Sequence, residues 1–127
     1  MDEFEQLLNK GDEAYKKDDY STAVCCYENA LKLATNENKN RFKSVLPMMG
    51  RCYRQMGVPR SVIELAKEAK KLFGRDFIDH VFLTTIAAAY ADLREFSNAN
   101  RCAQEAIKLE NGKKTKALQA VIDRLEK

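Results

Sequence analysis

The amino-acid sequence predicts an all-α fold in a single domain. Only two prolines and five glycines occur among 127 residues, so few positions break a helix. Apolar residues recur at intervals of three and four in nearly every segment, whereas no stretch alternates apolar and polar residues for long. With 45% apolar residues, a chain of this length buries enough surface to fold without disulfides or a metal.

Start and stop signals divide the chain into seven expected helices. Very short turns join them in three pairs, which requires each pair to form an antiparallel hairpin. The expected helices lie near residues 2–17, 21–34, 43–56, 60–72, 77–92, 96–109 and 113–126.

The third helix contains Pro47, which would cost about 3 kcal/mol or more inside a helix because it lacks a backbone N–H. A helix with Ser44 as its N-cap would place Pro47 in the first turn, where the missing N–H has no helical partner to lose. A longer, kinked helix that begins near Asn40 is the alternative. The sequence is compatible with both.

Small residues recur at fixed offsets in the three hairpins. Ala30, Ala69 and Ala106 are corresponding positions in the second helices, and they are 39 and 37 residues apart. In the first helices a small residue precedes an aromatic one, as Gly11 precedes Tyr15. Small residues let neighbouring helix backbones approach, while the aromatic rings fill the space between hairpins. The chain therefore contains three copies of one supersecondary unit.

The three copies resemble a known family. The segment GDEAYKKDDYSTAVCCYENALKL resembles a tetratricopeptide repeat, and MGRCYRQMGVPRSVIELAKEAKKL and IAAAYADLREFSNANRCAQEAIKL resemble a second and a third copy. The second departs most, because Val62 replaces the expected alanine and Pro59 stands where an aromatic is usual. The family period is 34 residues, so loops at 35–40 and 73–77 hold the extra residues.

This resemblance implies a right-handed α-solenoid of three helix-turn-helix hairpins, with one domain over residues 1–127 and a helix that covers the open end. The repeats span approximately 4–37, 43–73 and 77–110, and the capping helix spans 113–126. Its expected apolar face comprises Ala117, Leu118, Val121, Ile122 and Leu125. The alternative use of that face is dimerisation.

The sequence contains no motif that indicates an enzyme. It has no glycine-rich phosphate loop, no GxSxG and no HExxH. The single histidine, His80, is expected on the surface or at a helix cap. Four thiols without CxxC spacing are expected to be reduced core residues: Cys25, Cys26, Cys52 and Cys102. We therefore expect no catalytic residue, no metal and no cofactor.

Other broad classes are excluded by charge and hydropathy. No apolar run approaches the roughly 18 residues of a membrane span. The first residues, MDEFEQLLNKGDEAY, carry acids where a secretory signal carries lysines, so a cytoplasmic location is expected.

Charge is distributed unevenly along the chain. Residues 1–37 sum to −5, whereas residues 38–63 hold six basic residues and no acid. The family resemblance implies that the first helices line a concave groove, with Arg51 and Arg54 of the basic segment at its centre. One flank then comprises Leu8, Asp12, Tyr15 and Lys16, and the other comprises Thr84, Ala88, Ala91 and Asp92.

The resemblance also implies which family ligand to exclude. Repeats that bind the acidic C-terminus of heat-shock chaperones use a clamp of Lys, Asn and Arg. The corresponding sites here are Leu8, Asp12, Arg51, Thr84 and Ala88, of which only one is cationic. The chaperone clamp is therefore expected to be absent.

The resulting hypothesis is a non-enzymatic adaptor that binds an acidic or mixed-charge peptide or helix of a partner protein. Arg51 and Arg54 would pair with carboxylates through bidentate hydrogen bonds. Three alternatives stay open: a solvated basic face without a ligand, a nucleic-acid site around Tyr53, and a homo-oligomeric scaffold, such as a homodimer, that assembles through its terminal helices.

Overall fold

The structure, a computed structural model, describes residues 2–126 and is helical with no strand over that range. The all-α prediction is confirmed. The helices are α1 (Glu3–Lys16), α2 (Tyr20–Leu31), α3 (Phe42–Gln55), α4 (Arg60–Phe73), α5 (His80–Asp92), α6 (Phe96–Leu109) and α7 (Lys116–Leu125), with short 3₁₀ helices at Lys39–Arg41 and Arg75–Phe77.

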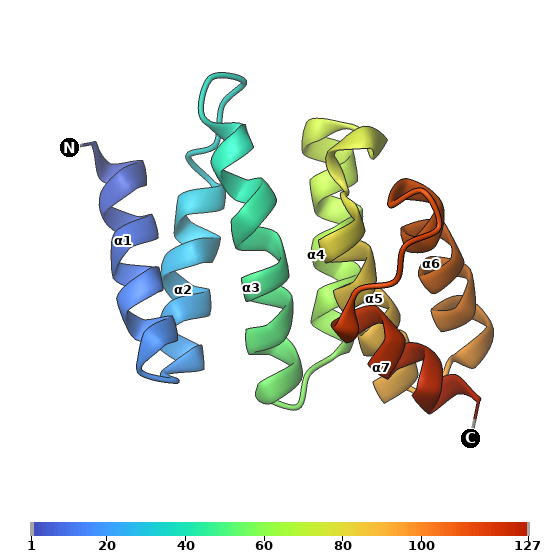
Figure 1. Ribbon diagram of the computed structural model, residues 1–127. Helices are drawn as coiled ribbons and strands as arrows, with labels where there is room; N and C mark the ends of the chain where they lie inside the picture. The colour runs from blue at the N-terminus through green and yellow to red at the C-terminus, as the bar shows by residue number, and fades with distance from the viewer. Residues whose placement is uncertain (1, 127) are drawn as a thin grey trace.

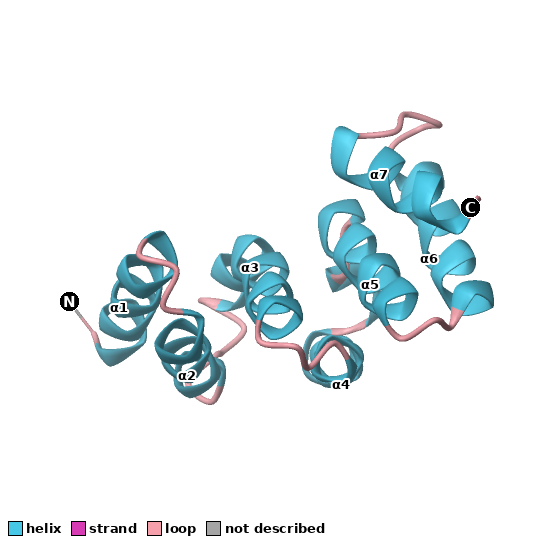
Figure 2. Ribbon diagram, turned by 90° about the horizontal axis from the view of Figure 1, so that it is seen from below, coloured by secondary structure: helices cyan, strands magenta, loops and turns pink. Residues whose placement is uncertain are grey.

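The helices stand side by side in chain order and form a curved array (Figure 1). Seen end-on, α1, α3, α5 and α7 lie toward one side, and α2 and α4 lie toward the other (Figure 2). We call the side of α1, α3, α5 and α7 the open face. The helices α1 and α2 pack as one hairpin and α5 and α6 as another, while α7 packs on both α5 and α6.

The three hairpin turns repeat the same backbone conformation. Asp18, Gly57 and Arg94 each have a positive φ, of 58°, 78° and 62°. In each turn the N–H of the next residue donates to a carbonyl five residues earlier, as Asp19 donates to Ala14 at 2.9 Å. This left-handed residue ends each first helix and directs the chain into the antiparallel second helix. The three turn residues are 39 and 37 positions apart, the same spacing as Ala30, Ala69 and Ala106.

Glycine is required where two helices approach closely. A Cβ at Gly11 would lie 2.5 Å from the Tyr27 ring, and a Cβ at Gly50 would lie 2.5 Å from Thr85 Cγ2. Tyr27 is fully buried beside Gly11, and its hydroxyl donates to Asp12 Oδ1 at 2.6 Å. The core extends through all three hairpins, so each hairpin depends on its neighbours for burial.

The start of α3 contradicts the first interpretation of Pro47. The helix begins at Phe42, directly after the 3₁₀ turn, so Ser44 lies inside it and Pro47 is its sixth residue. Phe42 is buried against Phe4 of α1, with ring centroids 5.6 Å apart. This contact stabilises a helix that begins at Phe42. The longer helix is thus the closer description, although it begins two residues after Asn40.

Three other helix bounds differ from the sequence prediction by three residues each. The second helix ends at Leu31, because the chain turns at Lys32. The fifth begins at His80 with Asp79 as its N-cap, and the seventh begins at Lys116 with Thr115 as its N-cap. In both caps a side-chain oxygen accepts a hydrogen bond from the N–H three residues on, which fixes the first turn.

The thiols contradict a further expectation, and of the two positions expected for the histidine the cap is excluded. Only Cys52 is buried, whereas Cys25 is exposed and Cys26 and Cys102 are half-buried. His80 is not a cap but the first residue of α5, and its Nδ1 lies 2.9 Å from Glu110 Oε1 at the end of α6. Cys25 and Cys26 are neighbours in α2, while Cys52 is in α3, Cys102 in α6 and His80 in α5. Within residues 2–126 no cluster of His, Cys, Asp and Glu has the arrangement of a metal site.

The last helix, α7, packs on α5 and α6 through its apolar face. Leu118 and Val121 are buried, and Ile122 and Leu125 pack against the core. Ala117, which was predicted on the same face, is exposed. In the described part of the chain no helix combines the length and the hydrophobicity needed to cross a bilayer.

Candidate functional site

Helix α3 forms the centre of the open face. Successive residues of a helix are about 100° apart, so the contacts of α3 define its sides. Arg41, just before α3, pairs with Glu5 of α1, and Gly50 faces Thr85 of α5. These two contacts lie on opposite sides of α3, and the side between them that is not buried belongs to the open face. Four residues share that direction, and each is exposed or half-buried: Ser44, Pro47, Arg51 and Gln55.

Arg51 is the cation on this central stripe. Its guanidinium carbon lies 5.9 Å from the centroid of the Tyr15 ring, and its Nη1 lies 3.4 Å from the Tyr15 hydroxyl oxygen. A guanidinium held beside an aromatic ring keeps most of its N–H donors free for a carboxylate. No carboxylate of residues 2–126 forms an ion pair with Arg51. Arg51 is thus held in place and remains exposed.

Arg54 is bound within the protein. Its Nε lies 2.6 Å from Asp92 Oδ2 and its Nη2 lies 3.2 Å from Asp92 Oδ1, which gives a bidentate pair between α3 and α5. Arg124 of α7 donates to the same carboxylate at 2.9 Å. Partial burial acts to raise the pKa of Asp92, but the hydrogen bonds from both arginines outweigh it and hold the pKa below its ordinary value. This cluster joins three helices.

Five of the six cations of the basic segment contact neighbouring elements. Arg41 Nη1 lies 2.5 Å from Glu5 Oε1, Arg60 pairs with Glu95, and Lys43 lies 5.5 Å from the centroid of the Phe77 ring. Together with Arg51 and Arg54, these contacts connect the middle hairpin to both neighbours. The segment that looked like a ligand site in the sequence is largely an inter-hairpin contact surface.

Two tyrosines show how the hairpins are held behind the open face. Burial, followed by the hydrogen bond to Asp12, raises the pKa of Tyr27 above its ordinary range. Burial, followed by the hydrogen bond to Glu28 of α2, likewise raises the pKa of Tyr53 in α3. Both hydroxyls therefore stay protonated and serve as donors. Tyr53 points toward α2, away from the stripe that carries Arg51.

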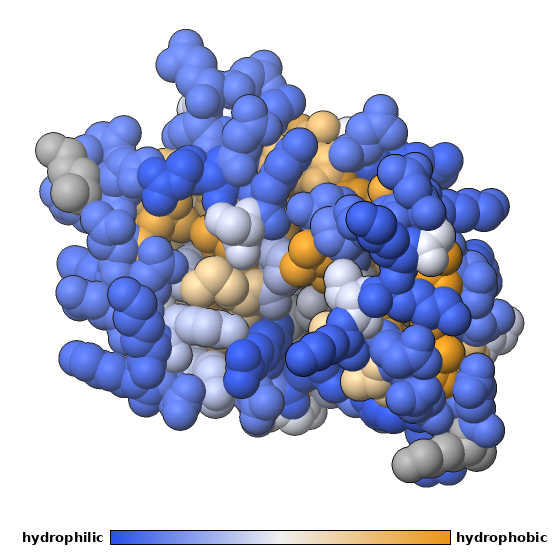
Figure 3. Space-filling model, in the orientation of Figure 1, coloured by the Kyte–Doolittle hydropathy of each residue, from blue (hydrophilic) through white to orange (hydrophobic). Residues whose placement is uncertain are grey.

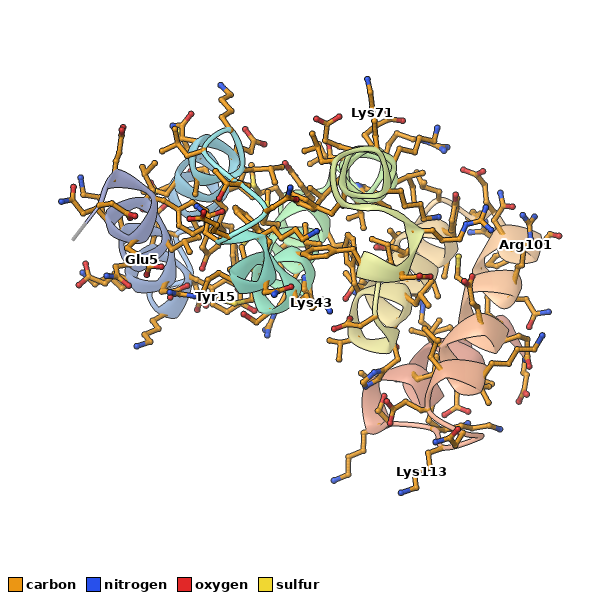
Figure 4. All side chains as sticks on the ribbon, turned by 90° about the horizontal axis from the view of Figure 1, so that it is seen from above. Glu5, Tyr15, Lys43, Lys71, Arg101 and Lys113 are labelled. Carbon is orange, nitrogen blue, oxygen red and sulfur yellow. The ribbon has the colours of Figure 1, made fainter. Side chains whose placement is uncertain are left out.

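The open face is hollowed between hydrophilic walls. Figure 3 views this face and shows apolar atoms in the hollow, bordered by hydrophilic side chains. Figure 4, seen from above, places Tyr15 and Lys43 on this side of the array and Lys71 on the opposite side. The geometry can hold an elongated ligand along α3, and it offers one exposed guanidinium near the middle.

Solved structures have the same arrangement of helices. The chain superposes on the TPR domain of Sgt2 from Aspergillus fumigatus with a TM-score of 0.78 and 19% identity, over 99% of this chain and 78% of that one. It superposes on the OM64 TPR domain of Arabidopsis with a TM-score of 0.76 and 19% identity, over 97% and 93% of the two chains. The chain has the tetratricopeptide-repeat fold. No family model matches the sequence, and the search of curated proteins finds no significant relative.

Within the tetratricopeptide fold, the predicted groove residues lie in different environments. Leu8, Thr84 and Ala88 are 1%, 7% and 3% exposed, so their side chains are buried rather than open to a ligand. Thr84 also donates to the His80 carbonyl at 2.9 Å. Both it and Ala88 belong to α5, against which α7 packs. The flank predicted on α5 is therefore closed apart from Asp92, which is bound to two arginines.

The flank on α1 is more open. Asp12 is half-buried and accepts the hydrogen bond from Tyr27, while Lys16 is exposed. Tyr15 is half-buried between α1 and α3, beside Arg51. Of the predicted residues, the structure brings Tyr15 and Arg51 into contact across one pair of hairpins and Arg54 and Asp92 across the next.

The sequence interpretation missed three residues of the tetratricopeptide surface. Ser44, Pro47 and Gln55 lie on the central stripe with Arg51. Their positions could have been recognised from the sequence, because residues 44, 47 or 48, 51 and 55 are three or four apart and therefore share one face of a helix that includes Ser44. The interpretation of Ser44 as an N-cap would have removed it from that face, whereas the structure places Ser44 inside α3.

Proposed function

We propose that this chain is a non-enzymatic adaptor that binds a segment of a partner protein along the open face of α3. The observation that carries the proposal is Arg51, an exposed guanidinium at the centre of the face that is fixed by Tyr15 rather than by an acid. The tetratricopeptide fold of the compared domains supports a role in protein interaction. A cytoplasmic location stays a prediction.

The ligand has an acidic or mixed-charge sequence. A carboxylate can accept two parallel hydrogen bonds from the Arg51 guanidinium, a geometry that lysine cannot offer. Beside it, two arginines share the single charge of Asp92, which leaves this cluster with a net charge of +1. Both features attract acids, while Asp12 and Lys16 supply charges of either sign at the edge.

The dimensions of the face set the length of the ligand. Ser44 and Gln55 are eleven residues apart in α3, and at 1.5 Å per residue the stripe is about 16 Å long. This length accommodates about five residues of extended chain or three turns of helix. Pro47, about one turn from the Ser44 end, presents an apolar surface between the polar ends.

Affinity capture from a lysate of the source cell tests this proposal. We expect the native chain to retain a partner with an acidic segment and Arg51→Glu to lose it, because the exchange turns attraction into repulsion. Lys71→Glu, on the opposite side of the array, is the matched control and should retain the partner. Arg54→Glu is avoided, since it would also break the pair with Asp92. Equal capture by Arg51→Glu would remove Arg51 from the site.

The two other candidate functions have separate tests. A nucleic-acid site would give appreciable affinity for an unrelated oligonucleotide near physiological salt, with a steep dependence on salt concentration. Light scattering over a concentration series would detect a homodimer as a mass above 14.5 kDa. We expect neither result, because five of the six cations of the basic segment contact neighbouring elements and the apolar residues Leu118 and Val121 of α7 are already buried against the core.

A further inference from the structure

A cleft of about 720 Å³ lies between α2 and α4, behind α3. These two helices do not pack closely on each other, and α3 separates them (Figure 2). The cleft opens on the side opposite to Arg51. It is therefore a second concave surface, independent of the open face.

The cleft combines an apolar base with an acidic border. Leu31 of α2 and Leu65 and Phe73 of α4 contribute buried or half-buried apolar surface, and Leu72 is 49% exposed. Together these side chains give the cleft an apolar surface that the apolar face of a ligand can cover.

The charges of the cleft are predominantly negative. Glu28, Glu64 and Glu68 line it, against a single base, Lys32. Glu28 accepts the hydrogen bond from Tyr53 and stays at the border. Glu64 lies 3.7 Å from Lys67, with both side chains more than 60% exposed, so this pair neutralises little. A chain with a net charge of +3 thus presents a local acidic site.

The spacing along α4 indicates the shape of the occupant. Six residues of α4 line the cleft; four of them, Ser61, Leu65, Glu68 and Leu72, form one helical stripe, and Glu64 and Phe73 lie to either side of it. Ser61 and Leu72 are eleven residues apart, which makes the stripe about 16 Å long. This length matches about three turns of a helix laid in the groove.

We infer that the cleft binds a basic amphipathic helix of a partner protein. Its apolar side chains would cover Leu72 and the cleft base, and its lysines or arginines would lie against Glu64 and Glu68. The site lies on the opposite side from the ligand of the proposed function and does not depend on it. The two sites would let one chain hold an acidic and a basic segment at the same time.

Fluorescence anisotropy with a synthetic probe tests the inference. The probe is an 18-residue helical peptide with leucines on one face and lysines on the other, and the comparison peptide has glutamate in place of each lysine. We expect the native chain to bind the lysine peptide and to bind the glutamate peptide at least tenfold more weakly. The double variant Glu64→Lys, Glu68→Lys should weaken binding of the lysine peptide at least tenfold.

Three controls locate the binding in the cleft. Glu13→Lys, Glu105→Lys makes the same change of charge at exposed acids outside the cleft and should leave binding within about twofold. Leu72→Ser should weaken binding without changing the charge. Arg51→Glu should leave it unchanged, which separates this site from the proposed function.

Several results would overturn the inference. They are no binding of the lysine peptide, equal loss in both double variants, or unchanged binding in the Glu64→Lys, Glu68→Lys protein. Circular dichroism of each variant shows whether it is folded, and Leu72→Ser gives an independent answer if a charge variant unfolds. Self-association of the native chain that Glu68→Lys abolishes would assign the cleft to a second copy instead.

Discussion

The close approach of α3 and α5 at Gly50 can be measured in a double-mutant cycle. A Cβ atom at Gly50 would lie 2.5 Å from Thr85 Cγ2, whereas carbon atoms in contact are about 3.5 to 4.0 Å apart. Gly50→Ala therefore creates an overlap of about 1 Å in a buried interface.

Two opposing effects set the change in the free energy of unfolding. Alanine favours a helix by about 1 kcal/mol relative to glycine. Overpacking of a buried contact costs about 1–3 kcal/mol. We expect the overlap to dominate, so Gly50→Ala should lower the free energy of unfolding by about 1 kcal/mol.

Thr85→Ser removes the methyl group that causes the overlap. The serine keeps the hydroxyl that donates to the Val81 carbonyl at 3.3 Å in the native chain. In this background Gly50→Ala should raise the free energy of unfolding by up to about 1 kcal/mol, because only the gain in helix propensity remains. The coupling between the two substitutions is then about 2 kcal/mol.

Urea unfolding followed by circular dichroism measures all four proteins. Gly11→Ala combined with Thr85→Ser is the control. Because Gly11 faces Tyr27 and not Thr85, those two substitutions should be additive within about 0.5 kcal/mol. A coupling near zero between Gly50 and Thr85 would refute the close contact between the second and third hairpins.

Three further predictions concern individual side chains. A thiol reagent at about pH 8 should label exposed Cys25 fast and Cys52 last, because burial raises the pKa of Cys52 to about 11. The reaction is followed by the absorbance of the reagent, and Cys25→Ser should remove its fast phase. Because the pKa of Asp92 is lowered in the folded chain, its ionised form stabilises the fold above pH 3.8, and this contribution is lost as the pH falls through the lowered pKa. The Asp92→Asn protein should therefore be less stable at neutral pH, and its stability should fall less steeply in acid unfolding. Tyr27→Phe should cost about 1–3 kcal/mol in urea unfolding, since the Asp12 carboxylate loses its buried donor, and an unchanged midpoint would contradict that hydrogen bond.

The sequence was sufficient for the fold because the signals that specify it are local and repeated. Alanines at Ala30, Ala69 and Ala106 are all fully buried, at the spacing that identified three hairpins. Short turns fixed the antiparallel pairing. The sequence did not decide between the two starts considered for α3, because the choice depends on Phe42 packing against Phe4, a contact between residues 38 positions apart.

The candidate site was less predictable because charge alone does not show whether a cation is already paired. Arg54 is bound to Asp92, which lies 38 positions away, and Arg41 is bound to Glu5, 36 positions away. Both separations are about one repeat. Checking each cation against acids one repeat away would have separated these arginines from Arg51, whose contact at the same spacing is a tyrosine.

Burial of the α5 flank could not be derived from the repeat pattern. Thr84 and Ala88 occupy positions that face the groove in the family resemblance, yet both are buried. The helix against which α5 packs, α7, lies outside the three copies, and its docking on α5 is a tertiary contact.

The most direct test of the binding surface is an NMR titration of the isotope-labelled chain with the acidic segment of its captured partner. We predict that backbone amide signals of Ser44, Arg51 and Gln55 shift on binding and that the Arg51→Glu protein shows no shifts at the same concentrations. Shifts confined to α2, α4 and α6, with those three signals unmoved, would contradict the assignment of the open face as the binding surface.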